Sequence, residues 1–361
     1  MEGKVLQIIN SSGLGGAETI VQELLEREKY PVFCLKEDEI ERFRAVSDEV
    51  YFGTKTRYYK QNPFVLFKLL NLIKQKKIEV MHVHLGTSLF YAILVKILIP
   101  HMKLIYHEHG EIFYNNKLKI LIKTFHNKID MYIAVSKVTK KKLVEDTGTP
   151  EDKITILYNF VNLNRLKEDK IKHNLQVREQ IKVEQNDFVI GYVGRLNKIK
   201  GCEYLIRALQ YLDMNYTCLI LGDGELKKEL EKLSYKLDVA ENVVFLGYKQ
   251  DIDAYYSLFD TLVMPSLSEA SPMTFYESQA YGIPIIGSDI PAIKELVSHG
   301  KNGLLFNVED SKDLASKIIF VYNNKDIRVK MKKYSLENVE KYSLDNYMKK
   351  LSEIYVDLSK N

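Results

Sequence analysis

The sequence lacks tryptophan and has only three cysteines among its 361 residues. The cysteines are scattered, so their spacing excludes both a disulfide framework and a cysteine-based metal site. A long apolar run is also missing. The longest one, residues 89–100, is interrupted by a lysine, so the sequence predicts no membrane span. The first residues lead directly into a strand-like run at 5–9, which is not typical of a signal peptide. These absences predict a cytoplasmic protein.

Positive charge is concentrated in one part of the chain. The net charge is only +4, yet residues 55–142 contain 17 Lys and Arg against 4 Asp and Glu. A basic surface of this size attracts phosphates, nucleic acid or acidic lipid headgroups, although a solvated basic face is the plain alternative. No aromatic-interleaved nucleic-acid module accompanies it, so we expect no nucleic acid among the partners.

Two segments of this basic stretch predict amphipathic helices. One lies at 118–128. The other has an apolar side followed by several lysines, and its apolar residues are Leu66, Leu69, Leu70 and Ile73. Basic amphipathic helices bind anionic membrane surfaces. An anionic membrane surface is therefore a further expected partner, with a peripheral position on the inner face of the cell membrane.

The length and the order of apolar segments predict two α/β domains. Strand-like and helix-like segments alternate through the first part of the chain and again from residue 188, which is typical of βα units in parallel sheets. We predict a Rossmann-like domain at 1–165, a polar linker at 166–186 and a second Rossmann-like domain at 187–340. Apolar residues at helical spacing near the end predict a helix within 341–361 that packs back toward the first domain.

In open parallel sheets, ligands bind beyond the carboxyl ends of the strands, and the strongest candidate site follows such a strand at 261–264. Ser271 is the predicted N-cap of the next helix, with a proline in its first position, and Gly282 ends it. The free amides near Met273 and Thr274 would form an anion site suited to a diphosphate.

Two glutamates lie in this same segment. Glu269 falls in the loop before the helix, and Glu277 lies about two turns into it. One carboxylate beside the phosphates and another farther along suit a sugar on one side and a ribose on the other. Taken alone, the segment also fits a capped surface helix with two incidental glutamates.

Glycine-containing loops follow three other predicted strands. In the loop after 188–193, Arg195 and Lys200 could converge on a leaving diphosphate and stabilise its charge without a metal. The turn at 221–226 contains Gly222. The loop at 13–18 contains Gly16 but fits a dinucleotide fingerprint only partly, because a glutamate replaces the third glycine.

Two patterns have metal-ligand spacing, and we interpret both otherwise. Asp251 and Asp253 form an Asp-x-Asp pair, but Asp251 is better placed as the cap of the following helix. His82 and His84 alternate along a strand without a third ligand nearby in the sequence. We therefore expect no metal and no cofactor.

Together these motifs resemble the retaining GT-B glycosyltransferases of family 4. The resemblance covers nearly the whole chain in order. Its motifs are Gly-Gly-Ala-Glu at 15–18, His82 with His84, His109 with Gly110, Val135 with Ser136, Asn159, the loop at 194–201, the turn at 221–226, and Glu269 with Glu277. The resemblance implies two Rossmann-like domains whose parallel sheets face a central cleft. The second domain would hold the nucleotide sugar and the first the acceptor.

The resemblance also implies roles for single residues. Arg195 and Lys200 would bind the diphosphate, Glu277 the ribose and Glu269 the donor sugar. The predicted catalytic residues are Glu269, His109, Arg195 and Lys200. The predicted donor-binding residues are Gly16, Arg195, Lys200, Gly222, Met273, Thr274 and Glu277. The run Asn159-Phe160-Val161-Asn162 departs from the usual Asn-Gly-Val-Asp, and Ala270-Ser271 replaces a frequent Gly-Phe, so the transferred sugar and the acceptor stay open.

The implied activity is transfer of a hexosyl or N-acetylhexosaminyl group, with retention, from a nucleotide diphosphate sugar, with a UDP-sugar favoured. The implied acceptor is a glycan or a lipid-linked sugar in cell-surface polysaccharide or glycolipid synthesis. Another GT-B enzyme, such as a sugar-nucleotide epimerase or a phosphorylase, is the main alternative. An NAD-dependent oxidoreductase is disfavoured by the incomplete glycine fingerprint, and an inactive scaffold protein is a third possibility.

Overall fold

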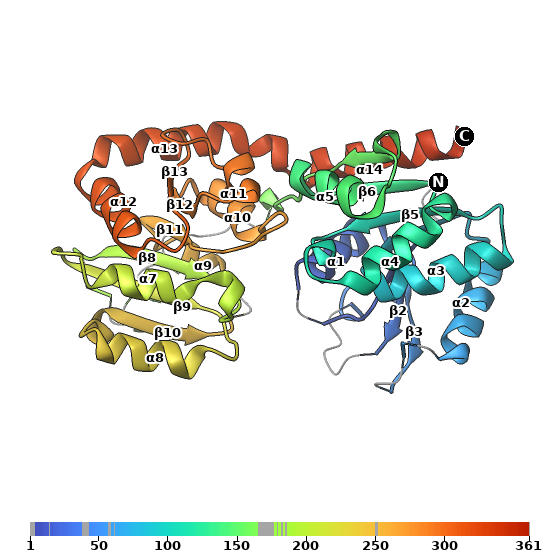
Figure 1. Cartoon of the computed structure of the whole chain (residues 1–361), viewed down its shortest axis with the longest axis horizontal. Coiled ribbons are helices and arrows are strands. Elements are labelled where there is room, and N and C mark those ends of the chain that lie inside the picture. Colours follow the sequence, from blue (N-terminus) through green and yellow to red (C-terminus); the bar gives the residue numbers. More distant parts are fainter. Residues whose placement is uncertain are drawn as a thin grey trace. The chain divides into compact units, whose positions relative to one another are not determined.

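The computed structural model describes residues 4–13, 15–37, 43–56, 59–60, 62–164, 177–178, 180–181, 183–184, 186–249 and 252–360. The chain divides into two compact units, which Figure 1 shows in cartoon form. Met1–Asn159 and Met348–Asn361 form the first unit, and Phe160–Tyr347 forms the second. Most of the linker predicted at 166–186 lies outside the described residues.

The first unit is built on a seven-stranded sheet with the order β3-β2-β1-β4-β5-β6-β7, in which every neighbouring pair is parallel. The strands are β1 (Val5–Ile9), β2 (Val32–Lys36), β3 (Val50–Thr54), β4 (Val80–His84), β5 (Lys103–Glu108), β6 (Met131–Ala134) and β7 (Ile154–Ile156). The strand order reverses between β1 and β4. The loops that follow these two strands therefore leave from the switch point, where such sheets bind ligands.

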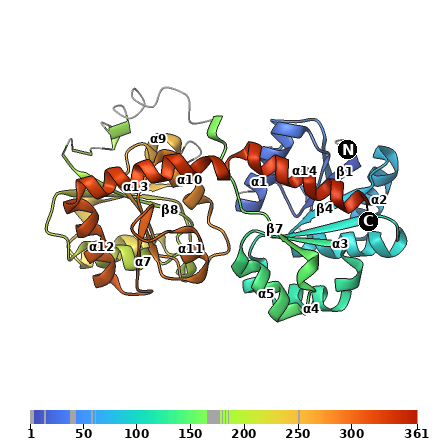
Figure 2. The ribbon, with the colours of Figure 1, turned by 90° about the horizontal axis from the view of Figure 1, so that it is seen from above.

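Helices cover both faces of this sheet (Figure 2). They are α1 (Gly16–Glu28), α2 (Pro63–Lys76), α3 (Gly86–Leu98), α4 (Asn116–Phe125), α5 (Lys137–Thr147) and the end of α14 (Leu344–Lys360). The larger core packs α2 to α5 against alternate strand residues such as Ile8 and Val83. A smaller core packs α1 against the opposite face through residues such as Ile9 and Val32. Buried strands explain why the sequence shows short, nearly continuous apolar runs.

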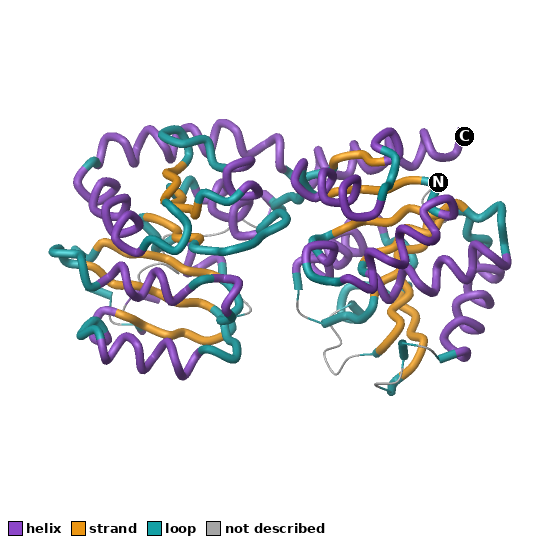
Figure 3. The backbone as a smooth tube through the Cα atoms, in the orientation of Figure 1, coloured by secondary structure: helices purple, strands orange, loops and turns teal. Residues whose placement is uncertain are grey.

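The second unit has a six-stranded parallel sheet with the order β10-β9-β8-β11-β12-β13 (Figure 3). The strands are β8 (Phe188–Val193), β9 (Tyr216–Leu221), β10 (Val243–Gly247), β11 (Thr261–Met264), β12 (Ile285–Ser288) and β13 (Gly303–Phe306). Its helices are α7 (Cys202–Leu209), α8 (Lys227–Lys236), α9 (Asp253–Tyr256), α10 (Met273–Tyr281), α11 (Pro291–Leu296), α12 (Ser311–Asn323) and α13 (Lys325–Asn338). Here the switch point lies between β8 and β11.

The predicted fold class is confirmed: the chain forms two α/β domains, each with an all-parallel sheet. Among the described residues, no helix combines the length and the apolar character that crossing a membrane requires.

Candidate functional site

The switch point of the second sheet brings Lys200 and Glu269 together. β8 and β11 are neighbours in the sheet, so the loops that follow them start from adjacent strand ends. Nζ of Lys200 lies 2.6 Å from Oε1 of Glu269, whose side chain is only 9% exposed. The hydroxyl of Ser266 donates to the same carboxylate oxygen at 2.7 Å. The structure thus pairs two predicted site residues that are far apart in the sequence.

The local backbone holds the Lys200 loop in place. A short 3-10 turn, Lys198–Lys200, is capped by Asn197, whose Oδ1 accepts a hydrogen bond from N of Lys200 at 3.0 Å. Gly201 follows with φ of 61°, and a Cβ there would lie 2.0 Å from the carbonyl oxygen of Pro265. Only glycine therefore allows the loops after β8 and β11 to approach this closely.

Arg195 lies at the start of the same loop with an exposed side chain. No ion pair of this guanidinium is seen within the described ranges, so it is available to an anion. Gly222 follows β9 with φ of 139°, and a Cβ there would lie 1.9 Å from the carbonyl oxygen of Gly194. The Gly222 turn therefore packs directly against the Arg195 loop.

Glu277 lies within α10 and contacts a residue that the sequence analysis missed. The hydroxyl of Tyr256, in α9, donates to Oε2 of Glu277 at 2.6 Å. The Tyr256 ring stacks on Tyr281 with centroids 5.5 Å apart. Burial, reinforced by the nearby Glu277 charge, raises the pKa of Tyr256 well above its ordinary value. The hydroxyl therefore stays protonated and holds the carboxylate in a fixed orientation.

The helix α10 begins one residue later than predicted, and its cap differs as well. The helix begins at Met273, so Met273 and Thr274 occupy its first turn, where amides lack intrahelical acceptors. The N-cap is Pro272 rather than Ser271, and no side chain caps the helix. Ser271 instead pairs its hydroxyl with that of Tyr276 at 2.5 Å. Because the Ser271 hydroxyl is engaged in this buried contact, the backbone amides in the first turn of α10 remain open to a ligand.

In the first unit, Gly16 is the exposed first residue of α1, directly beyond β1. His109 follows β5 and is half-buried, and its Nε2 lies 2.8 Å from Nδ1 of His84. Both residues therefore lie near the carboxyl ends of strands in their own sheet.

The sequence analysis set aside His82 and His84 as metal ligands because no third ligand lies nearby in the sequence. The structure shows that this reason is wrong. His107, on the neighbouring strand, supplies a third imidazole, and one ring nitrogen from each of the three lies within 4.8 Å of the others. In the described structure, however, all their ring nitrogens except Nε2 of His107 take part in hydrogen bonds. These imidazoles therefore form a series of hydrogen bonds and do not direct their lone pairs at one common point where a metal ion could bind. Asp251, the predicted helix cap, lies outside the described residues.

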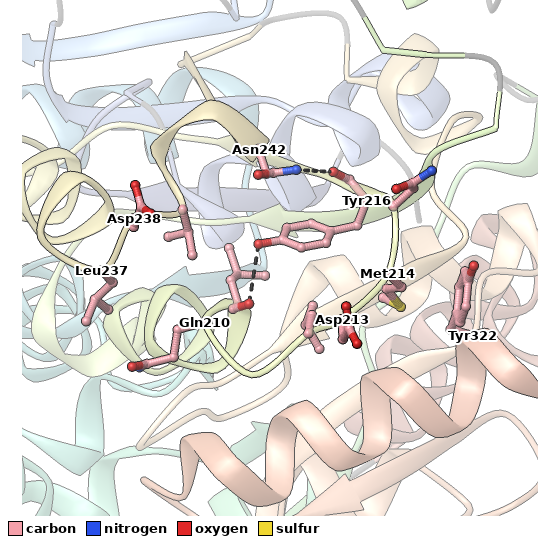
Figure 4. Close-up of a pocket in the computed structure, with 12 residues that line it drawn as sticks. Gln210, Asp213, Met214, Tyr216, Leu237, Asp238, Asn242 and Tyr322 are labelled. Carbon is pink, nitrogen blue, oxygen red and sulfur yellow. Dashed lines mark hydrogen bonds between the residues drawn. The ribbon is translucent and has the colours of Figure 1, made fainter.

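A hollow of about 700 Å³ lies in the second unit, and Figure 4 shows its lining residues. Its lining residues come from two segments, within 209–216 and 237–242, together with Tyr322. The first two segments precede β9 and β10, so the hollow lies at the amino ends of these strands. It is therefore at the opposite edge of the sheet from Lys200 and Glu269.

The fold and the site together define the class of protein. Two Rossmann-like sheets, with a cationic loop, a carboxylate and an open helix N-terminus at the switch point of the second, are typical of the GT-B fold. Comparison with known families agrees. The model of Glycosyltransferase Family 4 matches residues 14–165, and that of glycosyl transferases group 1 matches residues 174–338. The two models lie one after the other along the chain, and together with the fold they support a GT-B glycosyltransferase.

Individual relatives extend this comparison. The chain is 29% identical over 319 residues to the O-antigen biosynthesis glycosyltransferase WbnH of Escherichia coli, covering 85% of this chain and 86% of WbnH. It is 24% identical over 311 residues to the UDP-Gal:alpha-D-GlcNAc-diphosphoundecaprenol alpha-1,3-galactosyltransferase of Escherichia coli, covering 82% and 80% of the two chains. The structure of Anabaena HepE in complex with UDP-glucose is similar in fold, with a TM-score of 0.87 at 20% identity over 98% of this chain and 99% of HepE.

Proposed function

We propose that the protein transfers a hexosyl or N-acetylhexosaminyl group, with retention, from a UDP-sugar to a glycan or lipid-linked acceptor in cell-surface polysaccharide or glycolipid synthesis. The second unit binds the donor and the first binds the acceptor. The names of the two Escherichia coli relatives, one acting in O-antigen synthesis and one on a diphosphoundecaprenol-linked sugar, support the acceptor class. The UDP-glucose in the HepE complex supports the donor class.

The Lys200–Glu269 pair beside the open start of α10 is the observation that carries this proposal. When the bond between sugar and diphosphate breaks, the leaving group gains negative charge. Lys200, Arg195 and the first amides of α10 stabilise that charge, and Glu269 faces the sugar, where positive charge develops. The acceptor hydroxyl forms the new glycosidic bond, and its proton leaves with the diphosphate.

A donor screen tests the proposal. UDP should stabilise the protein in a thermal shift assay and NAD should not, and one UDP-sugar should be consumed, slowly without acceptor and faster with a lipid-linked acceptor. NMR of the product should show the donor's anomeric configuration. An inverted anomeric centre would refute retention, and conversion of the donor into an epimer without transfer would favour the alternative GT-B enzyme.

Glu277→Ala should raise the donor KM about tenfold to a hundredfold with little change in kcat. Glu277 is proposed to bind the ribose, which does not change during the reaction, so its contribution is about equal in ground and transition states. The loss corresponds to ~1 to 3 kcal/mol for hydrogen-bonding groups left unpaired. Tyr256→Phe, which removes only the hydroxyl that orients Glu277, should raise the same KM by a few-fold. A kcat defect with unchanged donor KM would contradict the ribose role.

The activity should persist in EDTA. The positive charge that a divalent ion supplies in other transferases comes here from Lys200, Arg195 and the dipole of α10. Steady-state rates measured with and without the chelator should agree within error. Loss of activity in EDTA that magnesium or manganese restores would refute metal independence.

The four apolar residues of α2 predicted to meet a membrane are not available to one. Leu69 and Ile73 are buried, and Leu66 and Leu70 pack against the core, because the apolar stripe of α2 faces the sheet. On α2 and α4 the exposed large apolar residues are instead Phe64 and Phe67, at 73% and 69%, and Ile120, at 65%. Exposed lysines accompany them on both helices, at Lys68, Lys74, Lys117 and Lys123.

We therefore propose that α2 and α4 bind the protein to an anionic membrane surface. The protein should sediment with anionic liposomes at low salt, and the double variant Phe64→Ser/Phe67→Ser should bind at least about tenfold more weakly, since each buried Phe contributes ~1.5 kcal/mol or more. Val329→Ser, at a residue of α13 that is 59% exposed, is the control. Failure of the wild-type protein to sediment would refute membrane association.

A further inference from the structure

A continuous series of hydrogen bonds connects His109 with the C-terminal helix. Nε2 of His109 lies 2.8 Å from Nδ1 of His84, and Nε2 of His84 lies 2.9 Å from Oε1 of Gln7. Nε2 of Gln7 donates to the hydroxyl of Tyr355, in α14, at 3.0 Å. Beyond Tyr355 the series continues over 2.7 Å to Nδ1 of His82, whose Nε2 lies 3.2 Å from Nδ1 of His107.

The alternation of strand residues places these polar groups on one face. Gln7, His82, His84 and His107 point away from the larger core, whose neighbouring members are Ile8, Met81, Val83 and Tyr106. Each of the four is fully buried, and Tyr355 is 2% exposed. Since buried polar groups are costly without partners, the series satisfies side chains that water cannot reach.

The imidazoles of the series are neutral. Burial lowers the pKa of His82 and of His109 to about 3, and it holds the pKa of His84 and His107 well below the usual value. A neutral imidazole carries one N–H and one lone pair, so each ring can donate through one nitrogen and accept through the other.

The amide of Gln7 fixes the direction of the bonds that lead to His109. Its oxygen only accepts, so Nε2 of His84 carries the proton and Nδ1 of His84 carries the lone pair. His109 must then donate to His84 through Nε2–H. On the other side, Gln7 donates to the hydroxyl of Tyr355, which also lies within hydrogen-bond distance of Nδ1 of His82. Hydrogen bonds aligned in one direction polarise and strengthen one another.

We propose that Gln7 and His84 are positioning residues that hold His109 as the Nε2–H tautomer, so that its Nδ1 accepts a hydrogen bond from a hydroxyl of the bound sugar. This inference rests on the proposed function. No described residue hydrogen-bonds to Nδ1 of His109. The ring of His109 stacks on the ring of His107, with the two centroids 4.1 Å apart, and this contact restricts its rotation. A protonated Nδ1 could only donate to such a hydroxyl, so the tautomer of His109 decides the direction of this bond.

Nitrogen-15 NMR of histidine-labelled protein without substrate tests the tautomer directly. We expect the spectrum of the wild-type protein to show Nδ1 of His109 unprotonated and Nε2 protonated. The opposite tautomer would overturn the inference without any variant. The measurement does not depend on turnover, so the expected tautomer in a protein without transferase activity would refute the proposed function and leave the positioning by Gln7 and His84 intact.

Two variants separate positioning from mere packing. Gln7→Met removes the anchor without changing the length of the side chain, so His109 should become a mixture of tautomers and kcat should fall about tenfold. Tyr347→Phe removes a buried hydroxyl of α14 that has no hydrogen-bond partner among the described residues, so tautomer and kcat should be retained. Equal effects of the two variants, or an unchanged His109 tautomer in Gln7→Met, would overturn the inference.

Discussion

Glu269→Gln is expected to lower kcat about a hundredfold while the donor KM changes by only a few-fold. Glutamine keeps the shape of the side chain and can still accept from Ser266 and Lys200, so the loop after β11 should keep its conformation. What it loses is the negative charge that we propose lies next to a sugar that gains oxocarbenium character in the transition state. One well-placed electrostatic contact of this kind contributes about a hundredfold to a thousandfold in kcat.

Steady-state kinetics with the cognate donor measures this effect, after circular dichroism has shown that the variant folds. Glu203→Gln is the matched control, because Glu203 also forms an ion pair in the second unit, with Arg207 at 3.1 Å, but lies on the exposed side of α7. Wild-type kcat in Glu269→Gln would show that the charge is not used in the transition state. A loss confined to the donor KM would show instead that Glu269 binds the donor equally strongly in the ground state and in the transition state.

The sequence predicted the elements of the site better than their contacts. Apolar runs and glycines placed Glu269, Glu277 and Lys200 beyond strands or within a helix, and the structure has them there. The pairing of Lys200 with Glu269 depends on the sheet order, which puts β8 beside β11 although other strands separate them in the chain. No local pattern in the sequence contains that order.

The residues that the sequence analysis missed share this cause. His107 joins His84 only because β4 pairs with β5 in a register that sets these two residues side by side. Tyr256 lies in a helix of four residues, too short to give a periodic signal, and 21 positions from its partner Glu277. The exposed side of α2 was misassigned because amphipathic spacing identifies an apolar stripe but not what covers it.

Lys200→Met should lower kcat/KM about a thousandfold, the largest loss that we expect from one substitution. Lys200 is proposed to stabilise the leaving diphosphate, and it is also the ion-pair partner of Glu269. Removing it therefore weakens leaving-group stabilisation and leaves the carboxylate near the donor sugar without its cation. Lys198→Met is the control, because Lys198 is an exposed lysine of the same 3-10 turn and should retain wild-type kinetics.

The ion pair also predicts a coupling in stability that distinguishes Lys200 from a merely nearby cation. In Lys200→Met, a side chain of Glu269 that is only 9% exposed loses its cation, so the free energy of unfolding should fall by ~1 to 3 kcal/mol. In the double variant with Glu269→Gln that uncompensated charge is absent, so the combined loss should be smaller than the sum of the single losses. Urea unfolding of the four proteins measures the coupling. Additive losses, or equal kinetic defects in Lys198→Met and Lys200→Met, would show that the 2.6 Å contact is not the interaction that organises this site.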